Sequence, residues 1–165
     1  MTTRAAKVLL IAAIALYYSL VVFNNLTDSN SNYQFVRHVL SMDNTFPGNH
    51  GMGRALPWPA IHVAFYASIL VWELSTTVLL WWGAVRLWRA LRRDAAAFNA
   101  AKNVAIVAMT LSMLMWMVAF ISVGGEWFLM WQSPIWNGIP AASRDFAIVG
   151  IVLLLVVQPD TEGQP

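Results

Sequence analysis

Cysteine is absent from this chain of 165 residues, and its absence excludes disulfides, thiolate metal sites and cysteine nucleophiles. Charged residues are scarce, because Asp, Glu, Lys and Arg together make up 11% of the sequence, against roughly 25% in a soluble domain. A soluble chain of this length has too much surface for so few charges to cover. The formal net charge of +2 is too small to indicate a nucleic-acid partner. The sequence also lacks a G-x-S-x-G motif and a glycine-rich phosphate loop, so it gives no support for nucleophilic catalysis.

Hydrophobic residues, in contrast, make up 59% of the chain and are concentrated in long runs. A helix needs about 20 apolar residues to cross roughly 30 Å of hydrocarbon. The runs therefore predict an all-α polytopic membrane protein, a single membrane domain over residues 1–165 with four transmembrane helices. The predicted spans cover about residues 5–23, 60–83, 103–124 and 141–157. The loops 24–59 and 125–140 lie on one side of the membrane and the loop 84–102 on the other.

The lysines and arginines are divided unevenly between the two sides. Seven of the ten share the side of the N-terminus and the loop 84–102, and they are Arg4, Lys7, Arg86, Arg89, Arg92, Arg93 and Lys102. Lys and Arg concentrate in cytoplasmic loops, so we expect a multi-pass membrane protein with both termini in the cytoplasm. The four arginines of the loop, Arg86, Arg89, Arg92 and Arg93, are expected to contact anionic lipid headgroups.

The loop 24–59 is predicted to carry a short helix on the outer membrane surface. Tyr33, Val36 and Leu40 recur at three- and four-residue spacing, which indicates an amphipathic helix over about residues 31–42. Tryptophans cluster near the predicted span ends, where indole rings are favoured, and this indicates an aromatic belt rather than a ligand cage. They are Trp58, Trp81, Trp82, Trp127, Trp131 and Trp136.

Several sequence strings resemble one bacterial family. They are FNNLTD at residues 23–28, VLSMD at 39–43, TFPGN at 45–49, GGEWFLMWQS at 124–133 and WNG at 136–138. The chain resembles the DUF2165 family of predicted small integral membrane proteins over about residues 5–160. The resemblance implies a bacterial membrane protein, and it implies no activity, because the function of the family is unknown.

Glu73 is the most informative single residue, because it lies near the midpoint of the second predicted span. A charged side chain costs about 2.5–3.5 kcal/mol at the centre of a membrane helix, so Glu73 is expected to face the bundle interior. Two interpretations remain open. One is a proton or cation site, and the other is a structural hydrogen bond between helices. The expected hydroxyl partners are Ser75, Thr76, Thr77, Thr110 and Ser112.

The third predicted span is rich in methionine. Met109, Met113, Trp116, Met117 and Phe120 share one face of a regular helix. We expect this stripe to pack against other helices, because thioethers fill irregular gaps well.

Polar residues on the outer side are the remaining candidates. His62 and Glu126 lie near span ends and are expected to approach each other, with Asp28 nearby. No two histidines have metal-binding spacing, so no metal or cofactor is predicted. His62 is expected to bind a loop carbonyl. Glu126 is expected either to cap loop backbone N–H groups or to pair with Arg37, Arg54 or Arg144. Asn24 and Asn25 begin a polar run that either makes turns or forms a lid over the bundle.

These features leave three candidate functions open. The first is a non-enzymatic accessory or scaffolding subunit of a membrane complex, for example a respiratory or oxidoreductase complex, with a membrane-protein partner or a homo-oligomer. The second is a small transporter or channel-like protein that uses Glu73. The third is a membrane enzyme, or a metal or quinone site, on the outer side. Beyond these, the bilayer is the expected partner.

Overall fold

The structure is a computed structural model, and it describes residues 1–161. Within these residues the chain is helical and contains no strand. Its elements are α1 (Thr2–Thr27), α2 (Ser29–Ser41), the 3-10 helix η1 (His50–Arg54), α3 (Pro59–Ala90), α4 (Ala95–Ala101), α5 (Asn103–Leu114), the π-helix η2 (Met115–Trp127), the 3-10 helix η3 (Met130–Gln132) and α6 (Ile139–Val157). The all-α prediction is confirmed.

Four helical segments are long and apolar enough to cross a membrane. They are Thr2–Thr27, Pro59–Ala90, Ala95–Trp127 and Ile139–Val157. Prolines lie in the first turns of α3 and α6. Proline is tolerated at the start of a helix because the N–H that it lacks would have no partner within the helix there. The predicted short helix of the outer loop is present as α2. These elements confirm the predicted four-span architecture.

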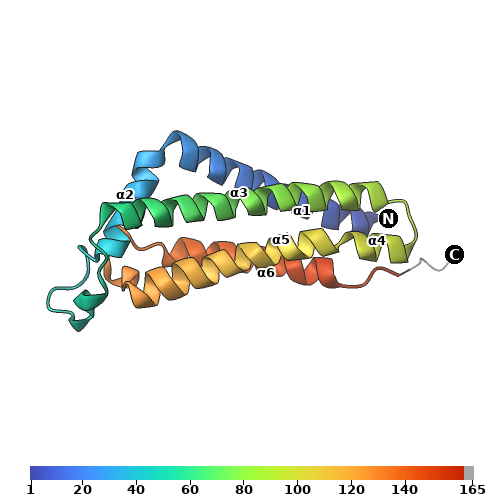
Figure 1. The fold of residues 1–165 in the computed structure, drawn as a ribbon. Coiled ribbons are helices and arrows are strands. Elements are labelled where there is room, and N and C mark those ends of the chain that lie inside the picture. Colours follow the sequence, from blue (N-terminus) through green and yellow to red (C-terminus); the bar gives the residue numbers. More distant parts are fainter. Residues whose placement is uncertain (162–165) are drawn as a thin grey trace.

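The four long segments run side by side along the long axis of the molecule (Figure 1). Helix α3 packs against both α1 and α5, and α6 packs against α5 and η2. The C-terminal half of α1 tilts away from the bundle, and α2 returns from its tip to α3 (Figure 1). This tilt separates the helices at the end of the molecule that carries α2, η1 and η3, which we call the loop end.

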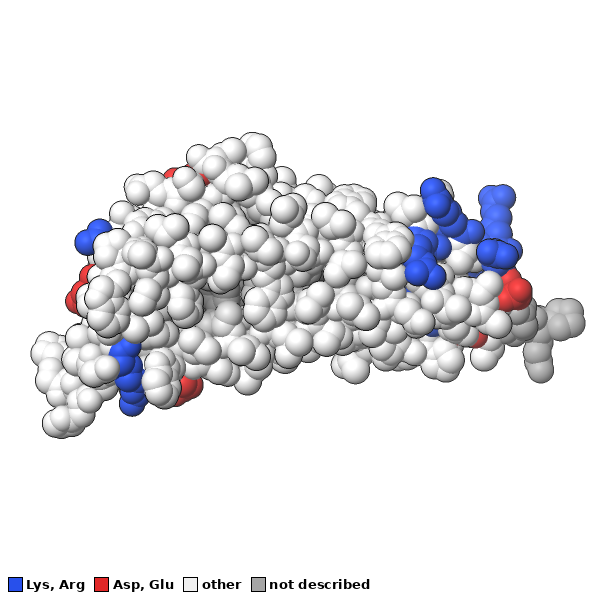
Figure 2. All heavy atoms as spheres, viewed as in Figure 1, with Lys and Arg blue, Asp and Glu red and all other residues white. Residues whose placement is uncertain are grey.

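The opposite end carries Arg86, Arg89, Arg92 and Arg93, and we call it the arginine-rich end. All four side chains are exposed, and basic residues gather there while the body of the molecule shows almost no charge (Figure 2). The predicted loop 84–102 is mostly helical, since α3 continues to Ala90 and α4 begins at Ala95. Asp94 caps α4 by accepting a hydrogen bond from the Ala97 N–H at 2.7 Å.

The third span changes its helical period at Met115, where α5 becomes the π-helix η2. In η2 the Ser122 hydroxyl donates to the Met117 carbonyl five residues earlier, at 2.9 Å. The wider turn rotates side chains away from the positions of a regular helix. The predicted single stripe is therefore wrong at one position: Met109 is fully buried, while Met117 is 43% exposed.

Two hydrophobic cores stabilise the fold. The larger core runs along the bundle and contains Tyr18, Leu80 and Met109, and the smaller core lies at the loop end around Val36, Leu40 and Met130. Residues from both cores line two cavities. The cavities lie where α2 crosses the bundle instead of extending it, because a crossing helix fills the space between long helices incompletely.

Candidate functional site

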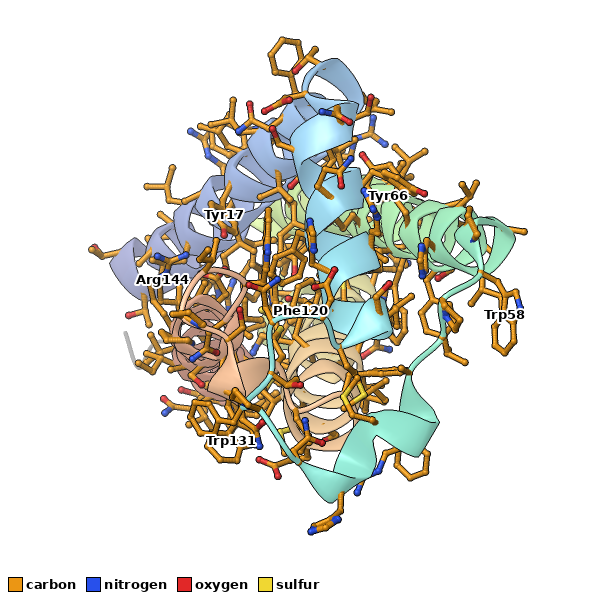
Figure 3. The ribbon with its side chains drawn as sticks, turned by 90° about the vertical axis from the view of Figure 1, so that its left-hand side faces the viewer. Tyr17, Trp58, Tyr66, Phe120, Trp131 and Arg144 are labelled. Atoms are coloured by element: carbon orange, nitrogen blue, oxygen red, sulfur yellow. The ribbon has the colours of Figure 1, made fainter. Side chains whose placement is uncertain are left out.

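A cavity of about 290 Å³ lies between α1, α2, α3, η2 and α6. Its polar lining residues are Tyr17, Asn25, Asn32, Tyr66, Glu73, Arg144 and Asp145. We call this space the central cavity. Viewed from the loop end, Tyr17 and Arg144 lie on the side of α1 and α6, Tyr66 lies toward α3, and Phe120 lies between them (Figure 3). Trp58 and Trp131 lie at the periphery in the same view.

Glu73 enters the central cavity from the middle of α3. Its side chain is 2% exposed, and its Oε2 accepts a hydrogen bond from the Asn25 amide at 2.5 Å. No donor among residues 1–161 reaches the second carboxyl oxygen, Oε1. Since a carboxyl group can accept several hydrogen bonds, Glu73 retains acceptor capacity toward the cavity.

Asn25 is held in place by α3. Its backbone carbonyl accepts a hydrogen bond from the Tyr66 hydroxyl at 2.6 Å, and its side chain is buried although it lies near the C-terminal end of α1. The tilt of α1 thus turns Asn25 inward, and Asn32 of the same polar run lines the cavity from α2. Asn24 and Asp28, which neighbour Asn25, are exposed and line neither cavity.

The expected hydroxyl partners of Glu73 were wrong. Ser75, Thr77 and Thr110 each donate to the carbonyl four residues earlier in their own helix, at 2.7–2.9 Å. Ser112 bonds the Tyr18 hydroxyl instead, and the buried Thr76 hydroxyl has no hydrogen-bond partner among residues 1–161. Hydroxyl side chains in helices commonly bond back to their own backbone, so the amide of Asn25 is the group that reaches the carboxyl.

A second acid lies beside the central cavity and is not among the residues singled out from the sequence. Asp145 on α6 is 5% exposed. Its Oδ2 accepts from the Tyr17 hydroxyl at 2.7 Å, and its Oδ1 accepts from Arg144 Nε at 2.9 Å. The signal was available, because Asp145 lies inside the predicted span 141–157 and an acid in a span marks a candidate site. Unlike Glu73, Asp145 has a cation and a hydroxyl as partners.

His62 and Glu126 occupy separate surroundings. His62 is buried, and its Nε2 lies 2.6 Å from the Leu56 carbonyl oxygen, as expected for a histidine that binds a loop carbonyl. Glu126 is exposed, and the expected pairing of its carboxyl with an arginine is wrong. Arg54 donates instead to the backbone carbonyls of Glu126 and Trp127, at 3.4 and 3.1 Å, because its guanidinium lies over the Trp127 ring.

Metal-capable side chains do not gather in the part of the chain that the structure describes. Residues 1–161 contain no group of three or more His, Cys, Asp or Glu side chains that could hold an ion. The outer-side candidates His62, Glu126 and Asp28 therefore form no joint site in this structure. Asn25 is the outer-side candidate that the fold brings to Glu73.

A second polar cluster lies at the arginine-rich end. Lys7 and Lys102 are buried, and their ammonium groups lie 2.7 and 2.5 Å from Oδ2 of Asp160. Both also donate to the Gln158 carbonyl. Burial alone would raise the pKa of the Asp160 carboxyl, but the hydrogen bonds from Lys102 and Lys7 lower that pKa below its ordinary value. This cluster joins the N-terminus, the start of α5 and the segment after α6.

Residues 3–159 match the model of one protein family, which is described as a predicted small integral membrane protein, DUF2165. Comparisons with curated proteins and with solved structures find no match. The family match covers nearly the whole chain, so it confirms the resemblance that the sequence strings indicated.

Proposed function

The chain belongs to the DUF2165 family of small integral membrane proteins, and from that premise we propose that it is a small transport protein that binds a solute or a proton at Glu73. One observation supports this proposal above the others. The carboxyl group of Glu73 lines the central cavity while one of its oxygens has no donor among residues 1–161. A structural polar group at this depth is expected to have its hydrogen bonds filled.

Labelling with dicyclohexylcarbodiimide tests whether Glu73 can be reached. This apolar reagent reacts with protonated carboxyl groups in apolar surroundings. In the full-length protein in detergent we expect the adduct on the peptide that contains Glu73, located by mass spectrometry. Glu126 is the matched acid outside the cavity and should remain unlabelled. A protein that is folded but carries no adduct at Glu73 would overturn the proposal.

Proton flux in vesicles tests transport itself. We expect reconstituted wild-type protein to speed the decay of an imposed pH gradient, measured with a trapped pH-sensitive dye. Glu73→Gln should abolish this increase, because it removes the ionisable group and keeps the shape. Glu126→Gln should retain it. Equal flux from wild type and Glu73→Gln would contradict a role for Glu73 in transport.

We further propose that the protein lies in a bacterial inner membrane with the arginine-rich end in the cytoplasm. The exposed arginines at that end support this orientation. A reporter fused after Leu91 should register in the cytoplasm, and registration on the opposite side would reverse the assignment.

An accessory-subunit role rests on a different feature, the exposed aromatic surface of α3. Trp82 and Trp88 are 54% and 65% exposed and fit the surface of a neighbouring membrane protein. Lipid would cover the same surface equally well. Isolation from native membranes in mild detergent, followed by mass spectrometry, tests this role. A stoichiometric partner would support it, and recovery of the chain alone would contradict it.

A further inference from the structure

Resting on the proposed function, we infer that the central cavity binds a lipophilic organic cation, with the positive charge beside Glu73. Three independent features of the cavity support this chemical class: its charge balance, its aromatic walls and its apolar neighbour.

The charge balance favours a single positive charge. Three residues that line the cavity carry formal charges: Glu73, Asp145 and Arg144. Arg144 pairs with Asp145 at 2.9 Å, and no cation among residues 1–161 pairs with Glu73. An ionised Glu73 therefore leaves the lining with one uncompensated negative charge. A buried charge of this kind is costly unless an opposite charge accompanies it.

The hydrogen-bonding groups of the lining leave one acceptor and one donor open. The Tyr17 hydroxyl is committed to Asp145, and the Tyr66 hydroxyl is committed to Asn25. Oε1 of Glu73 has no donor among residues 1–161, and the buried indole nitrogen of Trp116 has no acceptor there. The carboxyl oxygen suits the positively charged end of a ligand, and the Trp116 N–H can serve one acceptor atom of the same ligand.

Aromatic side chains form much of the cavity wall. They come from four helices and are Tyr17, Phe35, Tyr66, Trp116 and Phe120. Aromatic faces attract cations that are weakly hydrated, such as quaternary ammonium groups. A metal ion would instead require several oxygen ligands in place of its water, and the described residues hold no such cluster. The walls therefore favour an organic cation over an inorganic one.

An apolar cavity adjoins the central cavity and can hold the hydrophobic part of the ligand. It has a volume of about 230 Å³ and lies between α2, α3 and η2. Phe35, Val36, Ile69 and Phe120 line both spaces, so these side chains form a wall that the two spaces share. Specific ligand sites combine a mostly apolar lining with a few polar groups that fix orientation, and the two adjoining spaces fit that description.

The test compares tetraphenylphosphonium with tetraphenylborate, two ions of the same shape and opposite charge. Binding to the full-length protein in detergent is measured by equilibrium dialysis. We expect the phosphonium ion to bind, and the borate ion to show no binding above the detergent blank. Glu73→Gln should weaken phosphonium binding at least tenfold, and Phe120→Leu should weaken it about threefold to tenfold. Glu126→Gln is the matched control and should leave the affinity unchanged. Equal binding of both ions, or binding that survives Glu73→Gln, would overturn the inference.

A second measurement needs no variant, so it remains decisive if Glu73→Gln fails to fold. Phosphonium, but not borate, should protect wild-type Glu73 from carbodiimide labelling. Labelling that neither ion prevents would overturn the organic-cation inference and leave the proposed carboxyl site standing. Absence of labelling in both conditions would overturn the proposed function as well.

Discussion

Two acids in the bundle, Asp160 and Glu73, have opposite surroundings. At the arginine-rich end, Asp160 is surrounded by the ammonium groups of Lys7 and Lys102, and the same lysines donate to the Gln158 carbonyl. In the middle of α3, Glu73 has one amide partner and no cation among residues 1–161. A completed ion cluster holds chain segments together, whereas an acid with an open oxygen is available to a ligand. The comparison separates a structural acid from a candidate functional one.

Asp160→Asn should produce the largest loss of stability. The substitution leaves two buried lysines without their shared carboxylate, and breaking one side of a buried ion pair costs about 3–5 kcal/mol. Because the cluster lies at the end of the bundle, we expect about 3 kcal/mol, measured by unfolding in mixed micelles. Asp43→Asn is the control. Its partner is His38 and its side chain is 41% exposed, so its cost should be about 0–1 kcal/mol. Equal effects of the two substitutions would show that the Asp160 cluster stabilises the fold no more than an exposed pair does.

Lowering the pH should remove part of the stabilisation that Asp160 provides. The folded-state pKa of Asp160 lies below the ordinary value, so the folded protein binds fewer protons there than the unfolded chain. Its contribution is present above the ordinary aspartate pKa of about 3.9 and is lost as the pH falls through the lower folded-state pKa. The stability difference between wild type and Asp160→Asn should therefore be complete at about pH 6 and shrink below about pH 4. A difference that stays constant down to about pH 2 would contradict the pairing.

Gly83→Ala tests whether the arginine-rich half is closely packed. A Cβ on Gly83 would lie 2.8 Å from the Ala105 Cα atom and 2.9 Å from its nitrogen. Backbone atoms cannot move aside as side chains do, so we expect a loss of about 2 kcal/mol. Gly150→Ala is the control, because its Cβ would meet only the flexible end of Met113 at 3.3 Å. A loss no larger than that of the control would show that α3 and α5 can separate at little cost.

Glu73→Gln should have the smallest effect on stability, within about 1 kcal/mol of wild type. The glutamine oxygen can still accept from the Asn25 amide, and no cation loses its partner. The same carboxyl-to-amide change is therefore expected to be severe at Asp160 and mild at Glu73, measured in the same micelles. A loss at Glu73 as large as that at Asp160 would indicate a structural acid and contradict the proposed site.

Particular residues show how far the sequence predicts this protein. The four spans and the helix at 29–41 follow from local patterns, and all are present. Burial of Glu73 also followed, because an acid in a span must avoid lipid. The sequence did not identify the hydrogen-bond partner of Glu73. Asn25 belongs to another helix, and its sequence context predicts a loop just outside the first span. The same argument would have predicted burial of Asp145, because it also is an acid within a predicted span.

The sequence alone determined the number of spans, their approximate positions and the gathering of basic residues at one end. These are local properties, since the length of an apolar run and the charge of a loop do not depend on what packs nearby. The tertiary structure decided which polar atoms meet. Asn25 and Glu73 lie 48 positions apart, and Lys7 and Asp160 lie 153 apart. The tilt of α1, the crossing of α2 and the wider turn of η2 decide where space remains. Each of these three features results from packing between helices, and no single segment of the sequence specifies that packing.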